Sequence, residues 1–94
     1  MGYTSAMKLD IKKDAKRRLS ILSGQVSGIQ DMVENEKYCV DIITQIEAVC
    51  EALSSVKNII LENHIITHVL DQIKNGEEKK ATAEILKIYK LAQK

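Results

Sequence analysis

Two stripes of apolar residues with strict helical spacing constrain the fold of this 94-residue chain more than any other feature. In each stripe an apolar residue recurs every three or four positions, as on one face of an amphipathic helix. The first stripe is Ala15, Leu19, Leu22, Val26, Ile29 and Val33, and the second is Ile42, Ile46, Val49, Leu53, Val56 and Ile60. The polar sequence ENEK at 34–37 separates them. This pattern predicts two helices packed as an antiparallel hairpin.

The second helix is expected to be long, from about residue 38 to the low 70s, where Asn75 and Gly76 end it. Asp10 is a candidate cap for the start of the first helix. A third helix is expected after Gly76, because Glu77 and Glu78 precede a segment that ends in lysines, in agreement with the helix dipole. The chain has no proline, tryptophan or phenylalanine, which also favours an all-α fold.

Further apolar residues of the long helix lie outside its main stripe and need cover. They are Val40, Ile43, Ile59, Ile65, Ile66 and Val69. A chain of this length forms one domain, residues 1–94, with only a modest core, and residues 1–9 are expected to be flexible. We therefore expect a three-helix protomer whose long helices pair antiparallel with those of a second copy, giving an intertwined dimer that is a four-helix bundle.

Charge is unevenly distributed along the chain. Residues 1–18 carry six lysines and arginines against two acids, whereas residues 19–56 carry one lysine against six acids. A basic end beside an acidic middle is typical of a protein that presents part of its surface to a polyanion, although a solvated helix face is the commoner explanation. No segment resembles a membrane span or a secretory signal, so a cytoplasmic location is expected, with Cys39 and Cys50 as thiols.

The only two histidines, His64 and His68, are four residues apart and share one helix face. Two ligands rarely hold a transition metal well, and Cys39 is the candidate for a third. Cys39 and His64 are about 37 Å apart on a continuous helix, so they would share an ion only across an antiparallel dimer. Alternatively, these are ordinary histidines on a partly buried helix and a buried cysteine. Ile65 follows the first histidine where zinc proteases have glutamate, which argues against protease chemistry.

Two long segments resemble the copper-sensing operon repressors (the CsoR family) and their nickel/cobalt-sensing and formaldehyde-sensing relatives. RRLSILSGQVSGIQDMVENEKYCVDIITQIEAV at 17–49 is similar to the signature of the first two family helices, and LENHIITHVL at 61–70 is similar to the second ligand motif. The resemblance implies an all-α dimer, usually assembled into a tetramer as a dimer of dimers. It also implies a repressor that binds double-stranded operator DNA and releases it when the effector binds, with no small-molecule substrate and no membrane partner.

The resemblance further implies a metal site made of Cys39, His64 and His68 between subunits. Tyr38 and Glu84 match the pair that hydrogen-bonds the ligating histidine in copper-responsive members. Three ligands that include a thiolate suit Cu(I), whereas Ni(II), Co(II) and Zn(II) are the alternatives, because a histidine in the third position also occurs in the nickel/cobalt branch. Gly2 stands where the formaldehyde sensors have proline, which disfavours that branch.

For DNA contact, Arg18 matches a basic position of the family. Its neighbours on the first helix, Lys12, Lys13, Lys16 and Arg17, extend the basic face. Ser55 replaces the second basic family position, and Lys57 is the candidate substitute. Such contacts would mostly neutralise phosphates. A helical dimer with purely structural zinc is the alternative from another class; no nucleophile–base pair or cofactor motif supports an enzyme.

Overall fold

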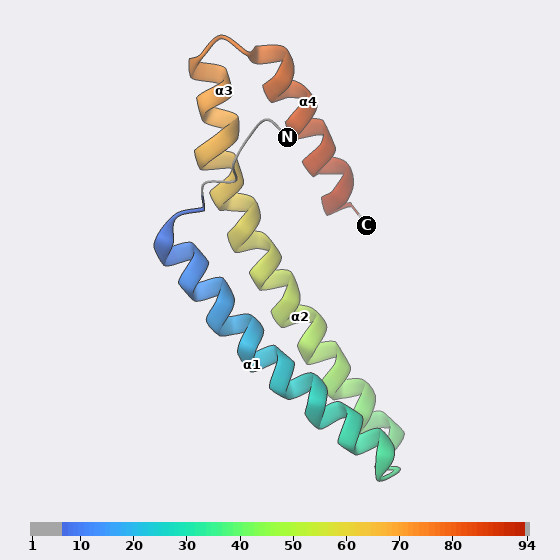
Figure 1. Ribbon diagram of the computed structural model, residues 1–94. Helices are drawn as coiled ribbons and strands as arrows, with labels where there is room; N and C mark the ends of the chain where they lie inside the picture. The colour runs from blue at the N-terminus through green and yellow to red at the C-terminus, as the bar shows by residue number, and fades with distance from the viewer. Residues whose placement is uncertain (1–6, 94) are drawn as a thin grey trace.

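The structure, a computed structural model, describes residues 7–93, and this part of the chain is helical without strands. It contains α1 (Leu9–Glu34), α2 (Cys39–His64), η1 (Ile65–Val69), α3 (Leu70–Lys74) and α4 (Glu78–Ala92). Because α2, η1 and α3 follow one another without a break, they form one long helix over residues 39–74 (Figure 1). The three-helix prediction is confirmed. The prediction that residues 1–9 are flexible concerns mainly residues 1–6, which lie outside the described residues, and Leu9 already belongs to α1.

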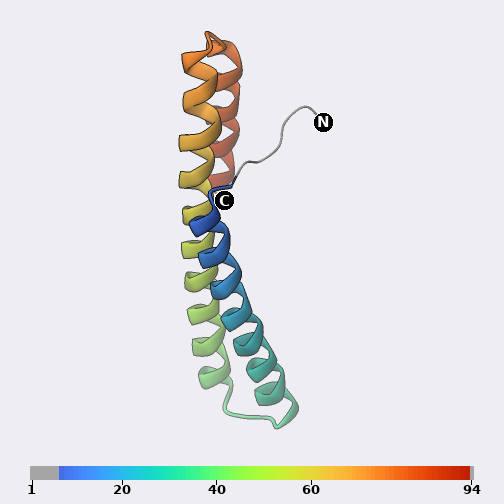
Figure 2. The ribbon, with the colours of Figure 1, turned by 60° about the vertical axis from the view of Figure 1, so that its left-hand side comes forward.

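The two shorter helices pack against different halves of the long one. α1 runs antiparallel beside α2, and α4 folds back along η1 and α3 (Figures 1 and 2). The protomer is therefore two helical hairpins that share one helix, and it is 57 Å long in its largest dimension. This arrangement brings α1 and α4 to the same long helix from its two ends.

The α1–α2 hairpin buries only half of the predicted apolar stripes. Ala15 and Leu22 of α1 pack with Val49 and Val56 of α2, and Ile29 joins them. These core residues recur every seven positions along each helix. Six other members of the stripes remain between 37% and 58% exposed, whereas Ile42 is half-buried; the six are Leu19, Val26, Val33, Ile46, Leu53 and Ile60. Each helix thus turns one row of its stripe to its partner and leaves the second row uncovered in the single protomer.

The protomer is too extended to cover its own apolar surface. Its radius of gyration is 17.7 Å, whereas a compact domain of this length has a value of about 12 Å. Large apolar residues on all helices stay exposed, among them Ile43, Ile66 and Leu86. Exposed apolar area of this extent marks an interaction surface, which supports the expectation of a second copy. Among the described residues, no helix is long and apolar enough to cross a membrane.

Both interhelical links use the same hydrogen-bonded helix end. At the end of α1 the amides of Glu36 and Lys37 donate to Val33 and Met32, and at the end of α3 those of Gly76 and Glu77 donate to Ile73 and Gln72. This pattern requires a left-handed residue. Glu36 and Gly76 take that conformation, with φ of 50° and 77°. The prediction for Gly76 is confirmed, but the predicted Asp10 cap is wrong, because α1 starts after Lys8 without a side-chain cap.

Candidate metal centre and basic surface

His64 directly precedes a π-helical turn of the long helix, and His68 lies within that turn. His64 is the last residue of α2, and His68 lies within η1. A π-turn holds more residues than an α-turn, so side chains four residues apart come closer to alignment. The two imidazole rings are accordingly neighbours, with centroids 4.8 Å apart and planes tilted by 38°. The structure therefore brings together the two histidines that the sequence paired.

Glu84 of α4 holds the ring of His64. Its Oε2 lies 2.6 Å from Nε2 of His64, and both side chains are about three-quarters buried. An ionised carboxylate can only accept a hydrogen bond, so Nε2–H donates, and a neutral ring then carries its lone pair on Nδ1. A metal-ligating histidine is commonly oriented in this way by a carboxylate on its other nitrogen. The predicted His64–Glu84 contact is present, and Nδ1 of His64 is the nitrogen suited to a metal.

A cavity of about 600 Å³ opens beside the two histidines. Residues of the long helix and of α4 line it, among them His64, His68, Asp71, Gln72, Lys80 and Glu84. Lys80 pairs with Glu77 at 2.8 Å, and this hydrogen bond raises the pKa of the Lys80 ammonium group. The cavity beside the histidines is therefore lined mainly by polar and charged residue types, and α4 forms one of its sides.

Cys39 and Tyr38 lie at the opposite end of α2. Cys39 is its first residue and is an exposed free thiol, and Tyr38 precedes it as the N-cap residue with 69% of its surface exposed. Within residues 7–93 of one protomer, no three His, Cys, Asp or Glu side chains are grouped to hold a metal ion. The single chain therefore separates the histidine pair from the cysteine, as the helix length predicts.

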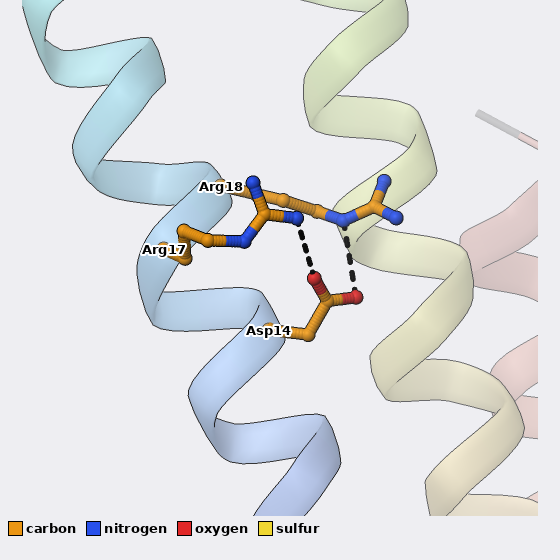
Figure 3. Close-up of polar contacts among 3 residues, drawn as sticks. All are labelled: Asp14, Arg17 and Arg18. Atoms are coloured by element: carbon orange, nitrogen blue, oxygen red, sulfur yellow. Dashed lines mark hydrogen bonds and ion pairs between the residues drawn. The ribbon is translucent and has the colours of Figure 1, made fainter.

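The basic residues of α1 are organised by one carboxylate. Arg17 Nη2 donates to Asp14 Oδ1 at 2.9 Å, and Arg18 Nε donates to Asp14 Oδ2 at 3.1 Å (Figure 3). These two hydrogen bonds, first that from Arg17, hold the pKa of the Asp14 carboxyl below its usual range. Lys12, Lys13 and Lys16 are exposed on the same helix. The sequence indicated the cations but not the acid that joins two of them.

Lys57 and Cys50 are exposed residues of α2 and lie apart from the basic residues of α1. Lys57 is exposed, but it lies in the groove between α2 and α4, which Ile60 and Lys87 also line, rather than on α1. Cys50 is a free thiol, as expected, and it is exposed in the protomer. It follows Val49, which faces α1, so the side chain of Cys50 is turned away from the hairpin core.

Sequence reasoning missed Asn63, which directly precedes His64. Only 7% of Asn63 is exposed, and its Oδ1 accepts a hydrogen bond from the backbone N–H of Lys8 at 3.3 Å. A signal was present in the spacing, since Asn63 follows the buried Val56 by the same seven residues that separate Val56 from Val49. The π-turn carried no comparable signal, because the apolar pattern continues through it.

The sequence of this chain is similar to those of known metal-sensing repressors. The model of the family "Metal-sensitive transcriptional repressor" matches residues 11–91. The copper-sensing transcriptional repressor CsoR of Bacillus subtilis is 46% identical over 84% of this chain and 78% of its own. The copper-sensing transcriptional repressor RicR of Mycobacterium tuberculosis is 40% identical over 80% of this chain and 73% of its own.

A solved structure agrees with the fold. The crystal structure of the copper-sensing repressor CsoR with Cu(I) from Geobacillus thermodenitrificans superposes with a TM-score of 0.84. It is 33% identical, and the match covers 93% of this chain and 91% of that one. Together with the family match over residues 11–91, this similarity means that the chain belongs to the metal-sensitive transcriptional repressors, which are not enzymes.

Proposed function

We propose that this protein is a Cu(I)-responsive transcriptional repressor that binds operator DNA without metal and releases it when Cu(I) binds. The proposed metal ligands are Cys39 of one protomer with His64 and His68 of its partner. The observation that carries the proposal is the His64–Glu84 contact, because it fixes the ring and leaves Nδ1 for a metal. Relatives that are 46% and 40% identical are named copper-sensing repressors, which favours copper as the metal.

The donor set suits Cu(I). A thiolate is a soft ligand and two imidazoles complete a site of low coordination number, whereas octahedral Ni(II) or Co(II) would need more donors. Cys39 is an exposed thiol, and so it is available to a second chain. The exposed half of each apolar stripe gives a reason for that second chain to pack along α2. Antiparallel packing of two long helices would bring residue 39 of one copy towards residues 64 and 68 of the other.

The DNA-binding role is assigned to α1, where Lys12, Lys13, Lys16, Arg17 and Arg18 gather, with Lys57 of α2 as a further contact. Contacts with phosphates would dominate and give a steep dependence on salt. A repressor of this kind acts in the cytoplasm, where its operator is, as a homodimer or a dimer of dimers. Copper would lower DNA affinity by binding more tightly to a conformation that does not fit the operator.

The test is an anaerobic titration with Cu(I), and separately with Ni(II), Co(II) and Zn(II), while binding to the promoter DNA of the protein's own operon is measured. One Cu(I) per chain with loss of DNA affinity supports the proposal, and His68→Ala should weaken both effects. Release by Ni(II) or Co(II) instead would assign the protein to the nickel/cobalt sensors. Metal binding without any change in DNA affinity would contradict the switch and leave a purely structural site.

A further inference from the structure

Asn63 is the one buried polar residue in the described part of the chain, and it is placed next to the histidine pair. Burying an amide side chain is unfavourable unless its polar atoms are hydrogen-bonded. Its Oδ1 accepts a hydrogen bond from the N–H of Lys8, 55 residues earlier. Its backbone oxygen accepts a hydrogen bond from the hydroxyl of Thr67, inside the π-turn, at 2.8 Å. Asn63 therefore contacts α1 through its side chain and the histidine-bearing turn through its main chain.

This contact continues the seam of the α1–α2 hairpin. Asn63 lies seven residues beyond Val56, and Lys8 lies seven residues before Ala15, both of which are core residues of that seam. The apolar seam thus ends, beside His64, in a polar layer made by Lys8 and Asn63. A single asparagine at such a position typically fixes the register of packed helices at some cost in stability. The position of α1 along α2 is accordingly set at the residue before His64.

The start of α1 has no side-chain cap of its own. Lys8, its N-cap residue, accepts the first helical hydrogen bond from Lys12 and donates its own N–H to Asn63. A cavity of about 250 Å³ lies beside this link, and Asp14 and Arg18 line it together with Asn63. The link is therefore close to the arginine that we assign to DNA contact.

We propose that Asn63 is a positioning residue that carries a change at His64 to the basic helix α1. The inference rests on the proposed function. Consecutive side chains point to different helices, since His64 is held by Glu84 of α4 and Asn63 holds Lys8 of α1. A shift of the long helix at this turn, imposed by metal binding, moves both contacts together. Asn63 thus joins the metal side of the molecule to the DNA side.

The first test removes the donor without touching Asn63. Lys8 has a φ of −57°, which suits proline, so Lys8→Pro removes the N–H and keeps the backbone conformation. Lys8→Ala is the matched control, because it loses the same charge and keeps the N–H. The measured quantity is the coupling factor, the ratio of DNA dissociation constants with and without Cu(I). We expect Lys8→Pro to lower it by about fivefold relative to Lys8→Ala, at equal Cu(I) affinity.

The second test acts on the acceptor. Asn63→Leu should lower the coupling factor as Lys8→Pro does, whereas Asn63→Asp, which keeps an oxygen acceptor, should retain it. The double variant Asn63→Leu with Lys8→Pro should have a coupling factor no lower than that of either single variant. Hydrogen exchange of residues 9–14 should respond to Cu(I) in the wild type and in Lys8→Ala, but not in Lys8→Pro. Equal coupling in Lys8→Pro and Lys8→Ala would overturn the inference. If the wild-type protein itself shows no release by Cu(I), the proposed function fails instead.

Discussion

The carboxylate of Glu84 lies 2.6 Å from Nε2 of His64, and this contact ties α4 to the end of α2. Both side chains are partly buried, so water competes with the contact less than it would at an open surface. α4 packs against η1 and α3. Among the described residues, the His64–Glu84 contact is the only ion pair between α4 and α2. The same hydrogen bond therefore orients the histidine ring and links α4 to the end of α2.

Replacing Glu84 should separate metal binding from DNA release. In Glu84→Ala, His64 keeps its nitrogens and binds Cu(I) nearly as well, but α4 no longer follows the ring. We expect the coupling factor, the ratio of DNA dissociation constants with and without Cu(I), to fall by about tenfold or more, within the usual range of coupling energies. Chelator competition gives the copper affinity, and fluorescence anisotropy gives the DNA affinity. Glu78→Ala, in the exposed first turn of α4, is the control; full release in Glu84→Ala would contradict this role.

Removing the acid between the two arginines should strengthen DNA binding. Asp14 accepts from both Arg17 and Arg18, so these cations must leave or share it when they meet phosphates. Asp14→Asn removes one negative charge from the basic face and should raise DNA affinity at low salt by up to about fivefold, as expected for exposed ion pairs. The salt dependence should also become steeper. Asp41→Asn, an acid of the first turn of α2, is the matched control, and equal gains in both variants would contradict a specific effect.

The same carboxyl should show its arginine contacts in its titration. Hydrogen bonds from Arg17 and then Arg18 lower the pKa of Asp14. Because the pKa is lowered in the folded state, the contacts stabilise the folded chain at pH values above the pKa of an unfolded aspartate. This stabilisation is lost as the pH falls through the lower, folded-state pKa. Carbon-detected NMR should give an Asp14 midpoint below that of an unfolded aspartate, and Arg17→Gln should raise it. An unchanged midpoint in Arg17→Gln would assign the shift to another cause.

The periodicity of the sequence was sufficient for the helices but not for the polar contacts. The stripes located both long helices, and Gly76 marked the turn, because spacing and backbone freedom are local properties. The distance from Cys39 to His64 followed from helix rise alone. The Asp14–Arg18 pair and the Lys8–Asn63 bond did not follow, since each depends on rotamers or on the register between helices. The π-turn at residues 65–69 was not predicted either, because the apolar pattern continues through it.

The two interhelical turns give a matched pair of stability predictions. Glu36 and Gly76 occupy equivalent left-handed positions, but only the glycine adopts that conformation without steric cost. Glu36→Gly should therefore stabilise the protein by about 1 kcal/mol, and Gly76→Ala should destabilise it by about the same amount. Urea unfolding at one fixed protein concentration measures both, because assembly makes stability depend on concentration. A loss of stability in Glu36→Gly would show that the side chain of Glu36 contributes more than its backbone strain costs.

A mixed dimer should show directly whether the proposed copper site lies between subunits. One chain carries Cys39→Ala and keeps both histidines, and the other carries His64→Ala and His68→Ala and keeps the cysteine. Neither variant alone can complete a Cys-His-His site, but a dimer of one with the other would contain one intact site if the ligands come from different chains. Anaerobic Cu(I) titration of the tagged, purified mixed dimer should therefore give one tight site per dimer, and each variant alone should give none. No tight site in the mixed dimer would contradict the intersubunit arrangement. A Cys-His-His site within one chain is excluded independently, because Cys39 and His64 are about 37 Å apart along one helix.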